Sequence, residues 1–144
     1  MQASEMMTTS IHCCTPTTRV ADAAKKMKEH DIGAIPIVES ESRRKLIGML
    51  TDRDIVVRLV AESMNPLECD VEDAMTGQTF SVTPETSEEE VCQLMEEHQV
   101  RRVPVVDNEG NCLGIISQAD IARRATEHET AELLKDISRP SRAA

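Results

Sequence analysis

The sequence has almost no aromatic residues: Phe80 is the only one, and tryptophan and tyrosine are absent. The core must therefore be built from aliphatic side chains and from the eight methionines, whose flexible thioethers fill irregular gaps. A nucleobase bound by this chain would be held between aliphatic side chains instead of being stacked on a ring. With 144 residues, the chain is long enough for one compact domain or for two small domains in close contact.

Positive charge is also scarce, since the formal net charge is −10. This charge argues against a nucleic-acid-binding surface, although a few arginines suffice for a small phosphorylated ligand. No apolar run is long enough to span a bilayer, and the first residues lack the basic and apolar stretches of a signal peptide. Five cysteines without a CxxC arrangement fit reduced thiols in a cytoplasmic protein, and the adjacent Cys13 and Cys14 are interpreted as two small strand residues.

The sequence contains no pattern typical of an enzyme. It has no nucleophile–base pair, no cluster of metal ligands and no glycine-rich phosphate loop, so we expect neither catalysis, nor a metal site, nor an obligatory cofactor. His30 and His98 fall at the ends of two predicted helices, where a cation interacts favourably with the helix dipole, and we interpret them in that way.

What the sequence does contain is a duplication. Residues 35–38 recur as residues 103–106, which lie 68 positions later. Residues 48–54 recur as residues 114–120, which lie 66 positions later, so one loop of the second copy is two residues shorter. The duplication predicts two similar halves related by a pseudo-twofold axis, with two related clefts between them.

Each copy predicts the order strand, helix, strand, strand, helix from its apolar periodicity and its turn residues. In the first copy the strands are expected at residues 11–14, 35–38 and 45–50, and the second helix at residues 51–59. The first helix is expected to start within residues 15–18 and to stop near residues 31–33, with Gly33 as its C-cap. In the second copy the elements are expected at residues 79–82, 86–98, 103–106, 113–116 and 117–122. The predicted division is repeat 1 at residues 4–60, a linker at 61–71, repeat 2 at 72–126 and a tail at 127–144, helical to about residue 137 and disordered from residue 138.

The doubled pattern Gly-φ-φ-Thr/Ser-x-x-Asp at residues 48–54 and 114–120, each preceded by an apolar strand that contains proline, resembles the CBS domain, a module named after cystathionine β-synthase. The resemblance covers about residues 4–126 and is closest to the stand-alone bacterial type. It implies an α/β (mixed α+β) fold of tandem β-α-β-β-α repeats packed as a pseudo-twofold pair, and a homodimer. It also implies a regulatory module that binds an adenosine-containing ligand (AMP, ADP, ATP or S-adenosylmethionine) between its repeats and acts on an effector protein.

The chemistry of such a ligand indicates which residues would bind it. The ribose diol suits a single carboxylate, which Asp54 or Asp120 would provide, and phosphate oxygens suit the helix starts at Thr51 and Ser117. The other candidates are Ile35, Pro36, Ile37, Val103, Pro104 and Val105 around the base, Thr15 and Thr83 on the opposite wall by resemblance, and Arg53, Arg101 and Arg102 near the phosphates.

The same hydroxyl and acid residues have a simpler explanation. Both motifs are also capping-box sequences, which stabilise a helix by about 0.5–2 kcal/mol and need no ligand. A non-binding structural CBS-pair protein that acts through dimerisation is therefore the alternative function. The two residues that stand between the hydroxyl and the acid also differ, because they are Asp-Arg in the first copy and Gln-Ala in the second. We therefore expect the two clefts to bind a ligand with unequal affinities.

Overall fold

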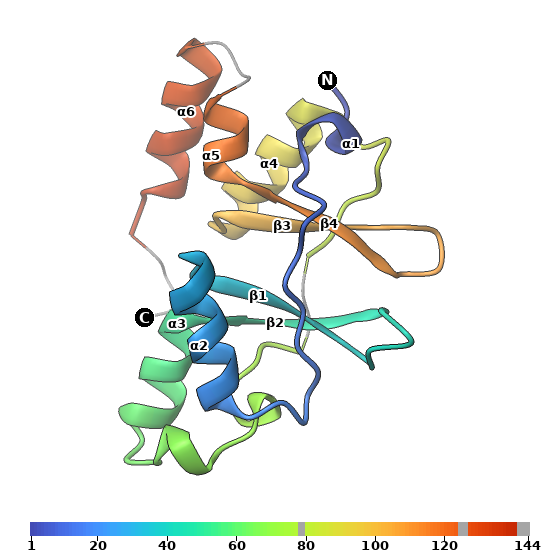
Figure 1. Ribbon diagram of the computed structural model, residues 1–144. Coiled ribbons are helices and arrows are strands. Elements are labelled where there is room, and N and C mark those ends of the chain that lie inside the picture. Colours follow the sequence, from blue (N-terminus) through green and yellow to red (C-terminus); the bar gives the residue numbers. More distant parts are fainter. Residues whose placement is uncertain (78–79, 124–126, 141–144) are drawn as a thin grey trace. The chain divides into compact units, whose positions relative to one another are not determined.

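The computed structural model describes residues 1–77, 80–123 and 127–140. It has the expected mixed α+β fold, with helices and two two-stranded sheets (Figure 1). The chain divides into two compact units, which we name after one residue of each. The Thr51 unit comprises Ser10–Thr79 and Glu109–Cys112, and the Ser117 unit comprises Met1–Thr9, Phe80–Asn108 and Leu113–Ala144.

The sheet of the Thr51 unit is an antiparallel hairpin. Strands β1 (Ala34–Val38) and β2 (Leu46–Thr51) pair so that Ala34 lies opposite Thr51 and Val38 lies opposite Leu46. Both strands form where the sequence predicts them. The hairpin therefore has a Thr51 end and a loop end, one strand length apart.

Helix α2 (Val20–His30) begins later than predicted and ends next to the predicted stop. It begins late because the Thr18 hydroxyl accepts a hydrogen bond from Thr15 N at 3.0 Å, in a turn that precedes the helix. The predicted cap is wrong, because Asp31, and not Gly33, adopts the left-handed conformation that terminates a helix, with φ 52°.

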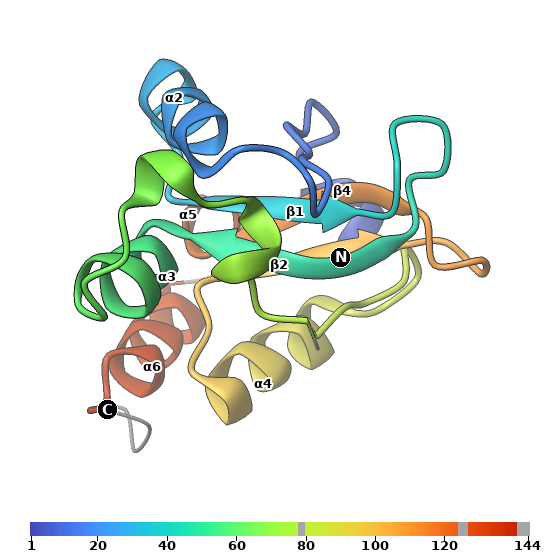
Figure 2. The same cartoon turned by 90° about the horizontal axis from the view of Figure 1, so that it is seen from below.

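Helix α3 (Asp52–Ile55) begins directly after Thr51, as predicted. It continues into a wider π-helical turn, η1 (Val56–Val60), and Figure 2 shows the two as one coiled segment. The segment that follows contains two short 3-10 turns, η2 (Pro66–Glu68) and η3 (Val71–Asp73).

The Ser117 unit repeats this order and adds a helix at each end. Its elements are α1 (Ala3–Met6), α4 (Glu88–His98), β3 (Arg102–Val106), β4 (Cys112–Ser117), α5 (Gln118–Ala122) and α6 (Glu127–Ile137). Helix α6 is the helical tail that the sequence predicts, and it packs against α4 and α5 (Figure 2). Disorder was expected from residue 138, but Ser138 N donates to Leu134 O at 3.1 Å in a closing turn; residues 141–144 and the predicted repeat end at residue 126 lie outside the described residues.

The strands predicted at residues 11–14 and 79–82 are wrong for the residues that the structure describes, and Thr79 lies outside them. Each segment makes a single parallel bridge, Cys14 with Ile37 and Val82 with Val105. The pairing stops there because the chain turns at the threonine and proline that follow each bridge.

The lead-in of each copy joins the sheet of the other copy. Thr8, which opens the first copy, pairs with β4 in the Ser117 unit, and Thr76, which opens the second, pairs with β2 in the Thr51 unit. A Cβ at Gly48 would overlap the Thr76 carbonyl oxygen, and one at Gly114 would lie 2.8 Å from that of Thr8. Glycine is therefore required where the lead-in crosses. The limits predicted for the repeats follow the duplication and stay a prediction.

Each unit has its own aliphatic core. The core of the Thr51 unit includes Val20, Ile35, Ile37, Leu50, Leu59 and Val71, and that of the Ser117 unit includes Val91, Met95, Val103, Ile116, Ile121 and Leu133. Phe80 is 42% exposed and belongs to neither core. In the part of the chain that the structure describes, no helix is long and apolar enough to cross a membrane.

Candidate functional site

Each unit has one junction where a strand ends in a hydroxyl residue and a short helix follows with an acid. In the first junction, residues 51–54, Thr51 Oγ1 accepts from Asp54 N at 3.0 Å and Asp54 Oδ2 accepts from Thr51 N at 2.9 Å. In the second junction, residues 117–120, Ser117 Oγ accepts from Asp120 N at 3.1 Å and Asp120 Oδ2 accepts from Ser117 N at 2.8 Å. Both junctions are therefore complete capping boxes.

The junctions differ at the second carboxylate oxygen. Asp120 is only 6% exposed, and its Oδ1 accepts a hydrogen bond from Arg123. Asp54 Oδ1 lies 4.0 Å from Arg58 Nε, which is too far for a hydrogen bond, and Arg58 donates instead to two backbone carbonyls at 2.8 and 3.0 Å. A ligand hydroxyl at Asp54 Oδ1 would therefore not have to displace Arg58, whereas at Asp120 Oδ1 it would have to displace Arg123.

The backbone N–H groups at the start of α3 are already used. Asp52 N donates to Gly33 O at 2.9 Å, Arg53 N donates to Asp52 Oδ1 at 2.8 Å, and Asp54 N donates to the capping hydroxyl. The Asp52 carboxylate thus occupies the place of a phosphate at a helix start, and its charge would repel one. In α5 the equivalent residue is Gln118, which carries no charge.

The predicted arginines lie beside the junction of their own unit. Arg53 is exposed on the first turn of α3. Arg101 is exposed and Arg102 is half-buried at the start of β3. Because Gln118 N donates to Arg101 O at 2.8 Å, these two arginines flank the second junction. Cationic side chains are therefore more concentrated at the second junction than at the first.

The apolar strand residues predicted around the base are buried. The four branched ones belong to the cores of their units: Ile35, Ile37, Val103 and Val105. The carbonyls of Pro36 and Pro104 accept hydrogen bonds from Cys14 N at 3.1 Å and from Val82 N at 3.0 Å. These residues hold the strands in place, and their role at a ligand stays a prediction.

Thr15 and Thr83 are not brought to the junctions. Thr15 follows Cys14, which bridges to Ile37 near the loop end of the hairpin, whereas Thr51 lies at the opposite end. At about 3.4 Å per residue, a whole strand separates the two threonines. Thr83 follows the equivalent bridge, and each N–H donates to a threonine hydroxyl three residues later at 3.0 Å.

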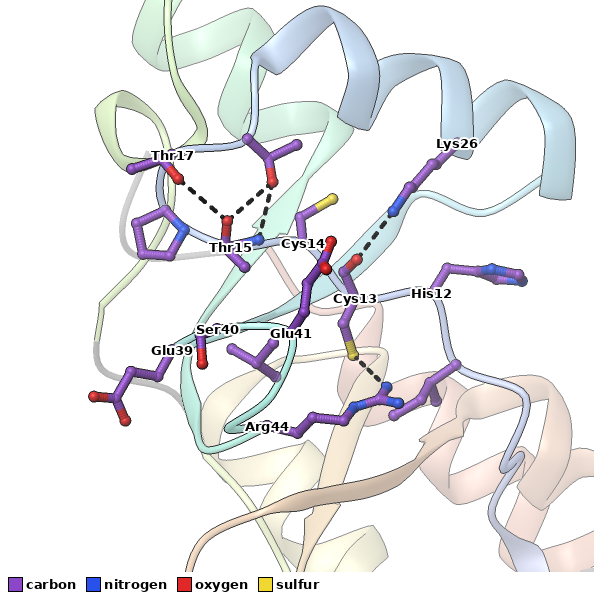
Figure 3. Close-up of a pocket in the computed structure, with 14 residues that line it drawn as sticks. His12, Cys13, Cys14, Thr15, Thr17, Lys26, Glu39, Ser40, Glu41 and Arg44 are labelled. Carbon is purple, nitrogen blue, oxygen red and sulfur yellow. Dashed lines mark hydrogen bonds between the residues drawn. The ribbon is translucent and has the colours of Figure 1, made fainter.

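A pocket of about 630 Å³ lies at the loop end of the Thr51 unit, lined by residues 11–18, 26, 38–41 and 44 (Figure 3). Inside it, Cys13 Sγ accepts a hydrogen bond from Arg44 Nη2 at 3.2 Å, and Lys26 Nζ donates to Cys13 O at 3.1 Å. The interpretation of Cys13 as a small strand residue missed this cluster. The signal available in the sequence was that Cys13 and Lys26 align with Ser81 and Leu94, so both depart from the repeat.

The two histidines predicted at helix ends each stack on another ring. His30 lies against His12 with ring centroids 3.6 Å apart, and His98 lies against Phe80 at 3.5 Å. Burial lowers the pKa of His12, and the charges of His30 and Lys26 lower it further. The described residues contain no group of three or more His, Cys, Asp or Glu that could hold a metal ion.

Comparison of the sequence with known protein families shows which family the chain belongs to. The CBS domain family matches residues 3–61 and 71–127, so the chain belongs to this family and carries its repeat twice. The sequence-based identification of a CBS pair is therefore confirmed.

Among its relatives, hypoxic response protein 1 of Mycobacterium tuberculosis is 39% identical over 138 residues, which cover 96% of this chain and 94% of the relative. A solved structure of hypoxic response protein I with two coordinated zinc ions has a TM-score of 0.78 at 37% identity, and the match covers 88% of this chain and 100% of that one.

Two further similar structures were solved with ligands. CBSX2 in complex with AMP has a TM-score of 0.73 at 26% identity, covering 85% of this chain and 93% of that one. The CBS domain pair of MJ0100, in complex with 5′-methylthioadenosine and S-adenosyl-L-methionine, has a TM-score of 0.75 at 25% identity, covering 85% of this chain and 94% of that one.

Proposed function

We propose that this protein is a regulatory, non-enzymatic module that binds an adenosine-containing ligand (AMP, ADP, ATP or S-adenosylmethionine) at its strand–helix junctions and passes the signal to an effector protein. The observation that carries the proposal is the geometry of Asp54. Its Oδ2 is fixed by the capping box, while its Oδ1 lies beyond hydrogen-bond distance of Arg58. A rigidly held carboxylate oxygen of this kind suits a ribose diol.

The ligands of two similar structures support the same chemistry. CBSX2 was solved with AMP, and the MJ0100 pair was solved with 5′-methylthioadenosine and S-adenosyl-L-methionine. All of these ligands share the adenosine group, and they differ in the charge attached to its 5′ position.

The charge difference between the junctions bears on which ligand each one prefers. At the first junction the Asp52 carboxylate disfavours a phosphate, so adenosine derivatives without a negative 5′ group fit better. At the second junction Arg101 and Arg102 favour the phosphates of a nucleotide. Ribose binding there has to compete with Arg123.

An apolar surface on η1 supports a homodimer. Val56, Val57 and Val60 are 57%, 45% and 55% exposed, and Met64 beyond them is 44% exposed. Exposed apolar groups of this kind are typical of surfaces that another chain covers. We propose a second copy as that chain, and the same surface supports the alternative function, a non-binding CBS pair that acts through dimerisation. The five free cysteines fit the proposed cytoplasmic location.

Two measurements test the ligand proposal. Because the chain has neither tryptophan nor tyrosine, a co-purified adenine would dominate its near-ultraviolet absorbance and would disappear after denaturation and filtration. Isothermal titration of the stripped protein with each of the four ligands then gives the affinities. No heat and no thermal shift with any ligand at millimolar concentration would refute ligand binding and favour the alternative.

A further inference from the structure

Two thiols meet at one arginine in the Thr51 unit. Arg44 Nη2 donates to Cys13 Sγ at 3.2 Å, and Arg44 O accepts a hydrogen bond from Cys112 N at 2.9 Å. The Cys112 side chain is hydrogen-bonded to that of Cys13. Cys13 is half-buried and lines the pocket in Figure 3, whereas Cys112 is buried and is not among the residues that line this pocket.

The surroundings of Cys13 favour its thiolate. The hydrogen bond from Cys112, the Arg44 guanidinium and the Lys26 charge together lower the pKa of Cys13 to about 6, against burial, which raises it. The adjacent Cys14 behaves in the opposite way, because burial raises its pKa. The two neighbouring thiols therefore differ: the surroundings of Cys13 favour the reactive thiolate, and those of Cys14 disfavour it.

We propose that Cys13 is a site of reversible oxidation by hydroperoxides and that Cys112 is the thiol that resolves it. The Cys13 thiolate attacks one peroxide oxygen, the O–O bond breaks, and the departing oxygen takes a proton to leave as water or an alcohol. Cys112 then gives up its proton and attacks the Cys13 sulfenic acid, whose S–O bond breaks to release hydroxide, which becomes water. The two thiols lose two electrons and form a disulfide, and the hydroperoxide gains them.

The residues of this cluster are not repeated at the equivalent positions of the other copy. Cys13 aligns with Ser81, and Lys26 aligns with Leu94, while Cys112 aligns with Leu46. The Ser117 unit therefore has the scaffold without the thiol pair, which serves as an internal reference.

Oxidation of the whole protein tests the proposal. With stoichiometric hydrogen peroxide and a chelator at pH 7, peptide mapping should find one intramolecular Cys13–Cys112 disulfide that dithiothreitol reverses. Cys112→Ser should form no such bond and should accumulate a sulfenic acid that dimedone traps at Cys13, whereas Cys14→Ser should behave as the wild type. A Cys13 that stays reduced, or that links to Cys14 or to another chain, would overturn the proposal.

The pH profile of alkylation tests the same cluster without oxidation. At pH 7 a thiol with a pKa near 6 is about 90% thiolate, against about 1% for a pKa near 9, but its weaker nucleophilicity takes back roughly twentyfold of that advantage. The rate advantage is then only about fivefold, so the shape of the profile is the better readout. Alkylation of Cys13 should level off near pH 7, and Arg44→Gln should move that plateau to higher pH; a rate that rises up to pH 9 in the wild type would contradict the proposal.

Discussion

The two junctions have the same backbone and the same capping box, yet they leave different groups available to a ligand. At the first, Asp54 Oδ1 lies beyond hydrogen-bond distance of Arg58, but the Asp52 carboxylate accepts the hydrogen bond of Arg53 N at the helix start. At the second, Arg123 holds Asp120, but two arginines flank a helix start whose first residue, Gln118, carries no charge. The two copies thus share the residues that stabilise the helix start and differ in the residues that we propose contact a ligand.

The largest expected effect is a difference in the free energy of unfolding between alanine variants of Asp120 and Asp54. Asp120→Ala should lower the free energy of unfolding by about 2 kcal/mol, because a buried carboxylate that satisfies Ser117 N is lost. Asp54→Ala should cost about 1 kcal/mol, the ordinary price of a cap. Urea denaturation with unchanged m-values measures both, and equal losses would remove the stability difference between the junctions. Arg123→Gln is the control, with an effect below about 0.5 kcal/mol since its side chain is 73% exposed.

The next effect is a difference in ligand affinity between asparagine variants of the same two acids. Asp54→Asn keeps an oxygen for the cap and removes the charge, so affinity for an adenosine ligand should fall about tenfold. Asp120→Asn should change it by less than about threefold, because Arg123 already engages that carboxylate. Isothermal titration measures both variants, and a larger loss for Asp120→Asn would reverse the assignment of the better ribose site.

A reciprocal exchange tests the role of charge at the helix starts. Asp52→Asn should raise the affinity for AMP at the first junction about threefold and leave that for adenosine unchanged, because a carboxylate no longer opposes the phosphate. Gln118→Asp should weaken AMP binding at the second junction by a similar factor. Titrations with AMP and adenosine side by side are the measurement, and equal changes for the two ligands would show that the charge is not responsible.

A further expected effect is on the pH dependence of stability, and it concerns Cys13, the thiol that the second copy replaces with serine. Its folded-state pKa of about 6 lies below the ordinary value of 9.0, so the unfolded chain binds more protons between these values. Stability from this group is therefore complete above pH 9, and it is lost as the pH falls through 6. Thermal unfolding across this range should show stability rising with pH in the wild type, and Cys13→Ser should flatten the rise. An unchanged slope in the variant would exclude Cys13 as its source.

The sequence predicts those parts of the molecule that depend on local signals. The hairpins, the starts of α3 and α5, and helix α6 follow from apolar periodicity and from hydroxyl–acid spacing. The start of α2 could not be predicted, because the Thr18 hydroxyl accepts a hydrogen bond from Thr15 N in a turn and does not cap the helix. The candidate ligand-binding residues around the junctions stay a prediction, and the partners that surround them, such as Arg123 and Asp52, depend on side-chain geometry that the sequence does not give.

The thiol cluster escaped prediction for a different reason. Cys13, Arg44 and Cys112 lie far apart in the sequence and meet only when the hairpin loop folds back beside the segment before α2. Spacing rules for cysteine motifs apply to ligands on one local segment, so they carry no information on such a meeting.

The exchanged lead-ins also determine when the protein can finish folding during its own synthesis. Thr8 emerges from the ribosome early, but its pairing partner Ile115 is translated only after helices α2, α3 and α4 and strands β1, β2 and β3 have been made. The Thr51 unit receives Thr76 much sooner after β2, so it can close its sheet first. The nascent chain should therefore carry the segment around Thr8 unpaired for most of translation. We expect a chaperone that acts during synthesis to bind this segment.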